Sequence, residues 1–171
     1  VAGHTARGFV MKNTAVGTAY EDIWGAGGEM TIPTGAVAWE VLSSSANDTN
    51  TAGTGARKVA ITSLDENYDL QTQIVNLNGT SAVALTGTHF WPDVAAVIEA
   101  GSTKSNEGTI TVRETSSTDT RMTVRINASV SEDTHITVPA GFTLYTVMVQ
   151  PFFPVNASGF IRNKVIPSGT D

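Results

Sequence analysis

The chain has 171 residues, of which 40% are hydrophobic and 15% charged, and its formal net charge is −6. This length suits one domain with a buried core, while the acidic balance and the scattered Lys and Arg residues argue against binding to nucleic acid or to an anionic membrane surface. The lack of cysteine excludes disulfides, thiol catalysis and thiolate metal sites, and no apolar run approaches the ~18 residues of a membrane span.

The first predicted element is residues 1–20, which are small, polar and Gly-containing and indicate an N-terminal arm or an edge strand. The segments that follow alternate between apolar and polar residues over about four to eight positions, which is typical of half-buried strands. The predicted strands cover residues 29–33, 36–43, 57–63, 70–77, 108–114, 120–130, 134–138 and 143–150. In the second of these, Trp39 alternates in phase with Val37 and Val41, which predicts a core position for the indole ring.

The longest alternating run, residues 120–130, predicts one strand with an apolar and a polar side. The apolar side holds Met122, Val124, Ile126 and Ala128, and the polar side holds Arg121, Thr123, Arg125 and Asn127. Residues 92–100 fit either a strand or a short helix opened by Pro92, and the strand is favoured.

Two turn signals separate predicted strands. Asn78-Gly79 predicts a two-residue hairpin between residues 70–77 and the next apolar run, because both positions accept positive φ. Residues 138–141 (VPAG) mark a turn before the last predicted strand. Eight to ten short strands with turn-rich connections predict an all-β, antiparallel β-sandwich over residues 21–150, with jelly-roll-like connections.

The C-terminal segment, residues 151–171, is predicted to be an extended tail. It contains Pro151, Pro154 and Pro167, which interrupt regular structure, and four large apolar residues. These are Phe152, Phe153, Phe160 and Ile161. We expect them to dock on a neighbouring subunit, and the alternative is that the tail packs on its own domain.

Local motifs for catalysis or metal binding are weak. Residues 53–58 (GTGARK) resemble a phosphate-binding loop, but Val59 follows Lys58 where Ser or Thr is required, so we expect a loop that enters a strand. Asp65, Asn67 and Asp69 have the first spacing of a calcium loop but lack its later Gly and Glu, which favours a turn-forming cluster.

The three His residues are isolated and Gly-x-Ser-x-Gly is absent, so no catalytic residue, metal ligand or cofactor is predicted and the chain is not expected to be an enzyme. A weak Ca²⁺ site and a hydrolytic β-sandwich stay open as alternatives. Trp24, which lies among glycines, is a candidate contact residue, but packing beneath its loop is the favoured role.

Several segments, taken in order, resemble a family of structural proteins from marine tailed phages. They are residues 21–24 (EDIW), Gly27-Gly28, Ile32-Pro33, residues 41–48 (VLSSSAND), residues 52–57 (AGTGAR), Leu64-Asp65, residues 75–80 (VNLNGT), Gly101-Ser102, Asn106, residues 108–112 (GTITV) and residues 138–141 (VPAG). The resemblance spans residues 16–150 and implies a virion component, namely a β-sandwich decoration or cement protein on the capsid exterior, assembled in the host cytoplasm. It brings no catalytic motif, and a place in the tail or a fibre stays open.

The sequence therefore predicts a protein that binds the major capsid protein or other virion proteins and forms a homo-oligomer, with a closed ring of three preferred. The expected contacts are Phe9 and Val10 in the N-terminal arm, Trp24, and the four apolar residues of the tail. The alternative is a receptor- or glycan-binding module that uses Trp24 and residues 43–56.

Overall fold

The computed structural model describes residues 33–133, together with Trp24, Ala26, Thr137, Val138, Gly141, Thr143 and Leu144. Within these residues the chain forms seven strands. They are β1 (Trp39–Ser43), β2 (Ala56–Asp65), β3 (Leu70–Asn76), β4 (Val83–Ala84), β5 (His89–Ala100), β6 (Ile110–Glu114) and β7 (Thr120–Val124).

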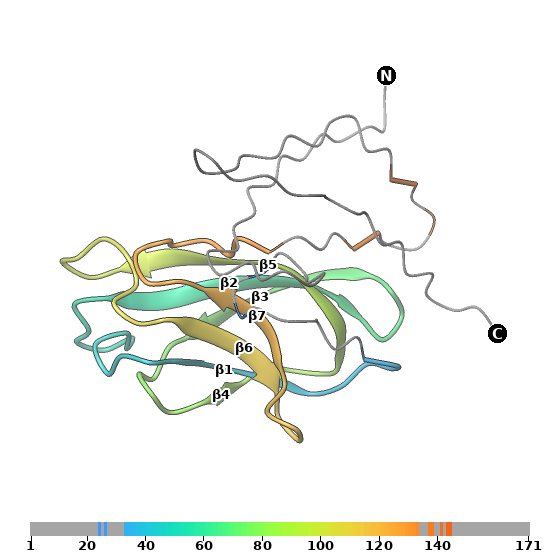
Figure 1. The fold of residues 1–171 in the computed structure, drawn as a ribbon, viewed down its shortest axis with the longest axis horizontal. Helices are drawn as coiled ribbons and strands as arrows, with labels where there is room; N and C mark the ends of the chain where they lie inside the picture. The colour runs from blue at the N-terminus through green and yellow to red at the C-terminus, as the bar shows by residue number, and fades with distance from the viewer. Residues whose placement is uncertain are drawn as a thin grey trace, which may run out of the picture.

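The strands form two antiparallel sheets that pack face to face, in the orders β4-β1-β6-β7 and β3-β2-β5 (Figure 1). The predicted all-β sandwich is therefore confirmed. The jelly-roll connections stay a prediction, and the two arms, residues 1–20 and 151–171, lie outside the described residues.

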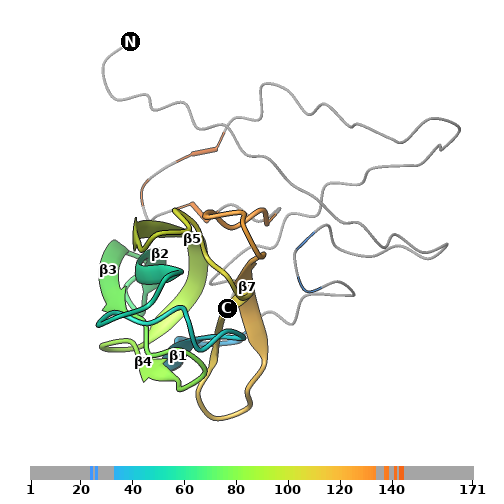
Figure 2. The same ribbon diagram turned by 90° about the vertical axis from the view of Figure 1, so that its left-hand side faces the viewer.

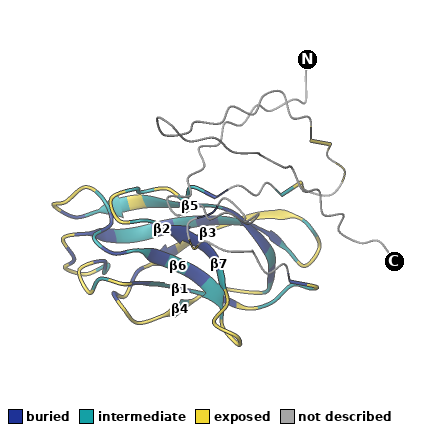
Figure 3. Cartoon of the chain, in the orientation of Figure 1, coloured by how far each residue is buried: buried dark blue, intermediate teal, exposed yellow. Residues whose placement is uncertain are grey.

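The core lies between the sheets, where alternate residues of each strand meet. In β1, Trp39, Val41 and Ser43 are buried and the residues between them are not, as the alternation predicted. The buried apolar cluster combines both sheets. It contains Trp39, Val41, Ala56, Val59, Ile61, Val75, Leu77, Leu85, Ala95, Ile110, Val112, Met122 and Val124. Figure 3 shows that exposed residues gather on the connecting loops.

Residues 92–100 belong to β5, so the favoured strand prediction is confirmed. β5 pairs with β2 along its length, with register shifts beside Ser63, which faces Pro92. Proline has no N–H to donate, so it fits at such an irregular point of the ladder.

The turn between β2 and β3 forms around the Asp65 carboxylate, which confirms the predicted turn-forming cluster. Its Oδ1 accepts the backbone N–H of Asn67 at 2.8 Å and that of Asp69 at 3.0 Å. The Asp65 N–H in turn donates to the Asp69 carbonyl oxygen at 3.0 Å. These local bonds set the register of the hairpin.

The predicted hairpin at Asn78-Gly79 is wrong. A turn forms there, with Gly79 at φ 59° and the Ser81 N–H donating to the Asn78 carbonyl oxygen. However, β3 pairs with β2 and β4 pairs with β1, so this turn leads the chain from one sheet to the other. Leu77 and Leu85, on either side of it, are both buried in the core between the sheets.

The predicted strand over residues 120–130 is too long, and its polar side is misassigned. β7 ends at Val124, and Ile126 is 54% exposed. Arg121 and Thr123 are buried, like Met122 and Val124, because both faces of β7 are covered. Arg121 is accommodated there by an ion pair to Glu114 at 2.5 Å.

Of the predicted strands 29–33, 134–138 and 143–150, the structure describes only Pro33, Thr137, Val138, Thr143 and Leu144, and these five are not in strands. The remaining residues of these segments lie outside the described part of the chain. Gly141, in the predicted turn 138–141, has φ 78° and forms part of a turn.

Candidate functional site

One end of the sandwich is organised around the buried carboxylate of Asp48. Its Oδ1 accepts the backbone N–H groups of Ala56 at 2.7 Å and Glu107 at 2.9 Å. Its Oδ2 accepts the Ser43 hydroxyl at 2.6 Å and the Gly108 N–H at 2.8 Å. Four donors satisfy the buried anion, so this group joins the loop between β1 and β2 to the loop before β6.

The rim of the same loops is held by Glu107. Its carboxylate accepts hydrogen bonds from the Asn47 amide at 2.8 Å and from the Thr54 hydroxyl. Gly55 lies beneath it, and a Cβ there would meet Asp48 Oδ1 at 2.1 Å. Only glycine allows the two loops to approach so closely.

Asn106 supports the neighbouring turn from inside. Its Nδ2 donates to the carbonyl oxygens of Gly108 and Arg125, both at 2.7 Å, and its Oδ1 accepts the Ser129 N–H at 3.1 Å. Some of the segments behind the phage resemblance meet here. Residues 41–48, 52–57 and 75–80, Gly101, Asn106 and residues 108–112 contribute to this loop cluster or to the strands that carry it, whereas Leu64-Asp65 lies at the opposite end of β2.

His89 and Ser63 form a hydrogen-bonded pair in the core. Ser63 Oγ lies 2.9 Å from His89 Nδ1, and the His89 ring stacks on Trp39 with ring centroids 5.0 Å apart. Nε2 lies 3.1 Å from the Thr86 carbonyl oxygen, which selects the tautomer with its proton on Nε2, so Ser63 donates to Nδ1. Burial lowers the pKa of His89 below its ordinary value of 6.5. Because Ser63 is only 1% exposed, this pair offers no surface to a substrate.

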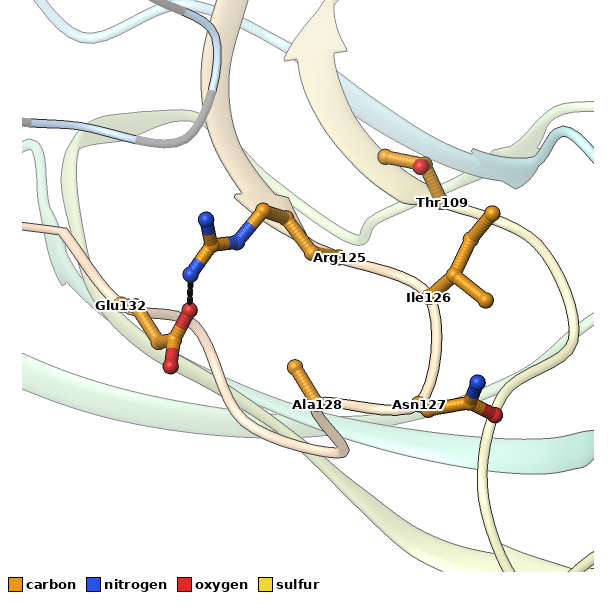
Figure 4. Close-up of a pocket in the computed structure, with 6 residues that line it drawn as sticks. All are labelled: Thr109, Arg125, Ile126, Asn127, Ala128 and Glu132. Carbon is orange, nitrogen blue, oxygen red and sulfur yellow. Dashed lines mark ion pairs between the residues drawn. The ribbon is translucent and has the colours of Figure 1, made fainter. Parts of the chain in front are cut away.

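An open hollow of about 490 Å³ lies beside the turn that follows β7 (Figure 4). Its lining includes Ile126, Asn127 and the ion pair between Arg125 and Glu132. These two side chains are in direct contact at one side of the hollow (Figure 4), so each charge is already paired within the chain.

The outer face of the three-stranded sheet is uncharged over two transverse rows. In one row Ile74 pairs with Ala60, which pairs with Ala96, and in the other Thr72 pairs with Thr62, which pairs with Val94. Paired residues share a face, so these six side chains form one surface. Ile74, at 65%, is the most exposed of the large apolar side chains in the described residues.

Within the described residues, β3 also leaves its outer edge open, and this strand lies at the margin of its sheet (Figure 2). Two backbone hydrogen bonds, one beyond each end of β3, show which of its residues bond to β2. They run from the Leu77 N–H to the Arg57 carbonyl oxygen and from the Asp65 N–H to the Asp69 carbonyl oxygen. By the antiparallel alternation, the residues that bond to β2 are the odd-numbered residues of β3, so the N–H and C=O groups of the even-numbered ones point outward. These are Leu70, Thr72, Ile74 and Asn76. No described strand or loop bonds to them.

The other sheet edges differ from β3. β4 has two residues. β5 is bonded along part of its edge by residues 129–131, through the Val97 N–H to Ser129 at 2.7 Å and the Ser131 N–H to Ala95 at 2.8 Å. β7 has four of its five residues buried. β3 is instead seven residues long, regular in register and without a charge, so it lacks the devices by which proteins block an edge.

The residues predicted as contacts fall mostly outside the described part of the chain, namely Phe9, Val10, Phe152, Phe153, Phe160 and Ile161. Trp24 is described and is 6% exposed. The predicted core position of Trp39 is confirmed, since this side chain is fully buried. The predicted entry of residues 53–58 into a strand is also confirmed, since β2 begins at Ala56.

Sequence reasoning identified the strand that becomes β3 but did not identify its open edge. The available signal was the segment LQTQIVN, which is seven residues without a charge or a proline. The Asp48 centre was also missed, since an Asp in a run of Ser, Ala and Asn is typical of a solvated loop. Within the described residues, no group of three or more His, Cys, Asp or Glu is placed to hold a metal ion, and no helix could cross a membrane.

Comparison with protein-family models, with curated proteins and with solved structures gives no match to this chain.

Proposed function

We propose that this chain is a virion structural protein, a decoration or cement protein that stabilises a phage shell through contacts between subunits. The observation that supports this best is the uncharged outer face of the three-stranded sheet, which ends at the open edge of β3. An edge of this kind is able to pair with another chain, and exposed apolar side chains beside it, such as Ile74, add contact area.

The loop cluster around Asp48 gives secondary support. Several of the sequence segments that resemble marine phage structural proteins, residues 41–48, 52–57 and 108–112, are joined there by hydrogen bonds to Asp48. The partners we propose are the major capsid protein and further copies of this chain, on the exterior of the shell.

The test is sedimentation of the purified chain with emptied phage shells, compared with sedimentation without them. We expect saturable binding to the shells, and binding that is weakened when residues 151–171 are removed. The same chain is incubated with a glycan array. Saturable glycan binding without shell binding would refute the proposal and support the receptor-binding alternative.

A further inference from the structure

We propose that two copies of this chain join through their β3 strands, edge to edge, in an antiparallel pair about a two-fold axis at Thr72. The result is a continuous sheet in the order β5-β2-β3-β3-β2-β5 across the two copies. The proposal deepens the proposed assembly function by naming one partner and the contact that it uses.

The backbone pattern of β3 permits this pairing. The outward N–H and C=O groups belong to the even-numbered residues, so two copies meet with even residues opposite even residues, as hydrogen-bonded antiparallel pairs require. An axis at Thr72 places Thr72 opposite its own copy and Leu70 opposite Ile74 of the second copy. Every outward group of residues 70–74 then has a partner.

The side chains of β3 are self-complementary in this register. Leu70 and Ile74, which are 41% and 65% exposed, come together on the outer face as two identical apolar cross-strand pairs. Such pairs stabilise antiparallel strands by about 0.2–1 kcal/mol each beyond an Ala pair. Thr72 faces Thr72, and a hydroxyl pair is compatible with this surface, since Thr72 already makes one with Thr62, where the two hydroxyl oxygens lie 2.9 Å apart.

The charges at the ends of β3 do not oppose the contact. The acids near the β2–β3 turn are Asp65, Glu66 and Asp69. In this register Asp69 faces Val75 of the second copy, whereas Asp65 ends β2, one strand further from the contact. The two Asp69 carboxylates are offset by six positions along the strands, which is roughly 20 Å. This exceeds the Debye length of about 8 Å at physiological salt, so the repulsion between the two Asp69 carboxylates is largely screened.

A second copy fits this edge better than an extended segment of another protein would, because the symmetry of the strand supplies both halves of the contact. An extended segment of another protein, or of the tail, would satisfy the backbone groups of β3, but it would not form the two-fold symmetric pairs of Thr72 with Thr72 and of Leu70 with Ile74. The pair also differs from the closed ring of three that is the preferred expectation from the sequence, because a two-fold edge contact closes at two copies.

The chain has no cysteine, which makes single cysteine variants informative. In Thr72→Cys the two sulfur-bearing residues form a hydrogen-bonded pair with Cα atoms about 5.5 Å apart, within the range of a disulfide. We expect Thr72→Cys to form a covalent dimer under mild oxidation. Thr62→Cys is the matched control, because it removes the same Thr62–Thr72 hydrogen bond but lies three strand spacings, about 14 Å, from its symmetry mate.

Light scattering of the full chain gives an independent measurement. We expect twice the single-chain mass of 17.9 kDa, and one copy for Ile74→Pro, because its lost N–H points to the second copy and not to β2. Ile74→Val keeps the N–H and should stay a dimer, and circular dichroism shows whether Ile74→Pro is folded.

Two results would overturn the contact. One is equal cross-linking of Thr72→Cys and Thr62→Cys. The other is a wild-type chain that is a monomer or a trimer, together with a Thr72→Cys variant that forms no disulfide. These outcomes do not contradict the proposed virion function, which is tested separately by binding to shells. Conversely, a Thr72→Cys dimer that does not sediment with shells would retain the contact and refute the function.

Discussion

Ser63 Oγ lies 2.9 Å from Nδ1 of His89, in the core between the two sheets. The His89 ring is 2% exposed and has its other nitrogen beside the Thr86 carbonyl oxygen. Protonation of Nδ1 would turn the Ser63 hydroxyl from donor to acceptor and would place a positive charge in the core, where burial disfavours it. The folded chain therefore favours the neutral ring, which agrees with the lowered pKa of this group.

The first prediction follows from that pKa. Because the unfolded chain takes up the His89 proton more readily than the folded chain, the stability contributed by the neutral ring is full above the ordinary pKa of 6.5 and declines as the pH falls through it. We expect the free energy of unfolding, measured by urea titration, to fall between about pH 7.5 and about pH 5.

The His89→Phe variant assigns this decline, since it keeps a ring against Trp39 and removes the titration. We expect it to lower stability by about 1–3 kcal/mol at neutral pH, because Ser63 loses its acceptor, and to flatten the pH dependence. Asp65, Glu99 and Glu114 also have lowered pKa values, but their contributions are lost only as the pH falls below ordinary values of 3.8 to 4.5. An unchanged slope in His89→Phe would contradict the assignment.

The second prediction concerns the Asp48 carboxylate. Asp48→Ala leaves four buried donors without their acceptor, so we expect a loss of about 3 kcal/mol or more in the free energy of unfolding. Asp69→Asn is the control, because that side chain is exposed, and it should change stability by less than about 0.5 kcal/mol. Similar losses for the two variants would show that Asp48 does not hold the loops together.

The third prediction tests the close approach of the loops at Gly55. Gly55→Ala adds a Cβ 2.1 Å from Asp48 Oδ1, so either the carboxylate or the loop must move. We expect a loss of about 1–3 kcal/mol, as for other overpacked sites. In Gly35→Ala the new Cβ meets nothing within 4 Å, and thermal unfolding should show little change. A neutral Gly55→Ala would mean that the two loops separate easily.

The fourth prediction concerns the direction of the Asn106 amide. Asn106→Asp replaces the donor Nδ2 with an oxygen that would face the carbonyl oxygens of Gly108 and Arg125, each at 2.7 Å. We expect a loss of about 2–3 kcal/mol at neutral pH, partly recovered in acid, where a protonated carboxyl group can donate. The measurement is urea unfolding at neutral pH and in acid. The control is Asn76→Asp, which changes an exposed amide. Equal stability of the two variants would contradict the donor role.

Several features of the fold could be predicted from local sequence because their causes are local. Alternating side chains predicted most of β1, β2, β3 and β6, and the short side chain of Asp65 predicted the turn that it forms. The same reasoning was wrong where a longer-range effect decided. Asn78-Gly79 forms a turn, but Leu77 and Leu85 on either side of it are buried between the sheets, and the chain passes from one sheet to the other.

The strand predicted from the alternation of residues 120–130 was correct only up to Val124. The alternation alone does not show where pairing with β6 ends, and it does not show that both faces of β7 are covered.

The sequence by itself determined the strand-forming segments and the uncharged character of LQTQIVN, since both depend on residues that are neighbours along the chain. Only the tertiary structure decided that this strand ends a sheet, because edge position depends on which strands pair across distant parts of the chain. It also decided that Asp48 is buried, because two of its donors come from Glu107 and Gly108, which are 59 and 60 residues away. A carboxylate becomes a core group only when folding brings such donors to it.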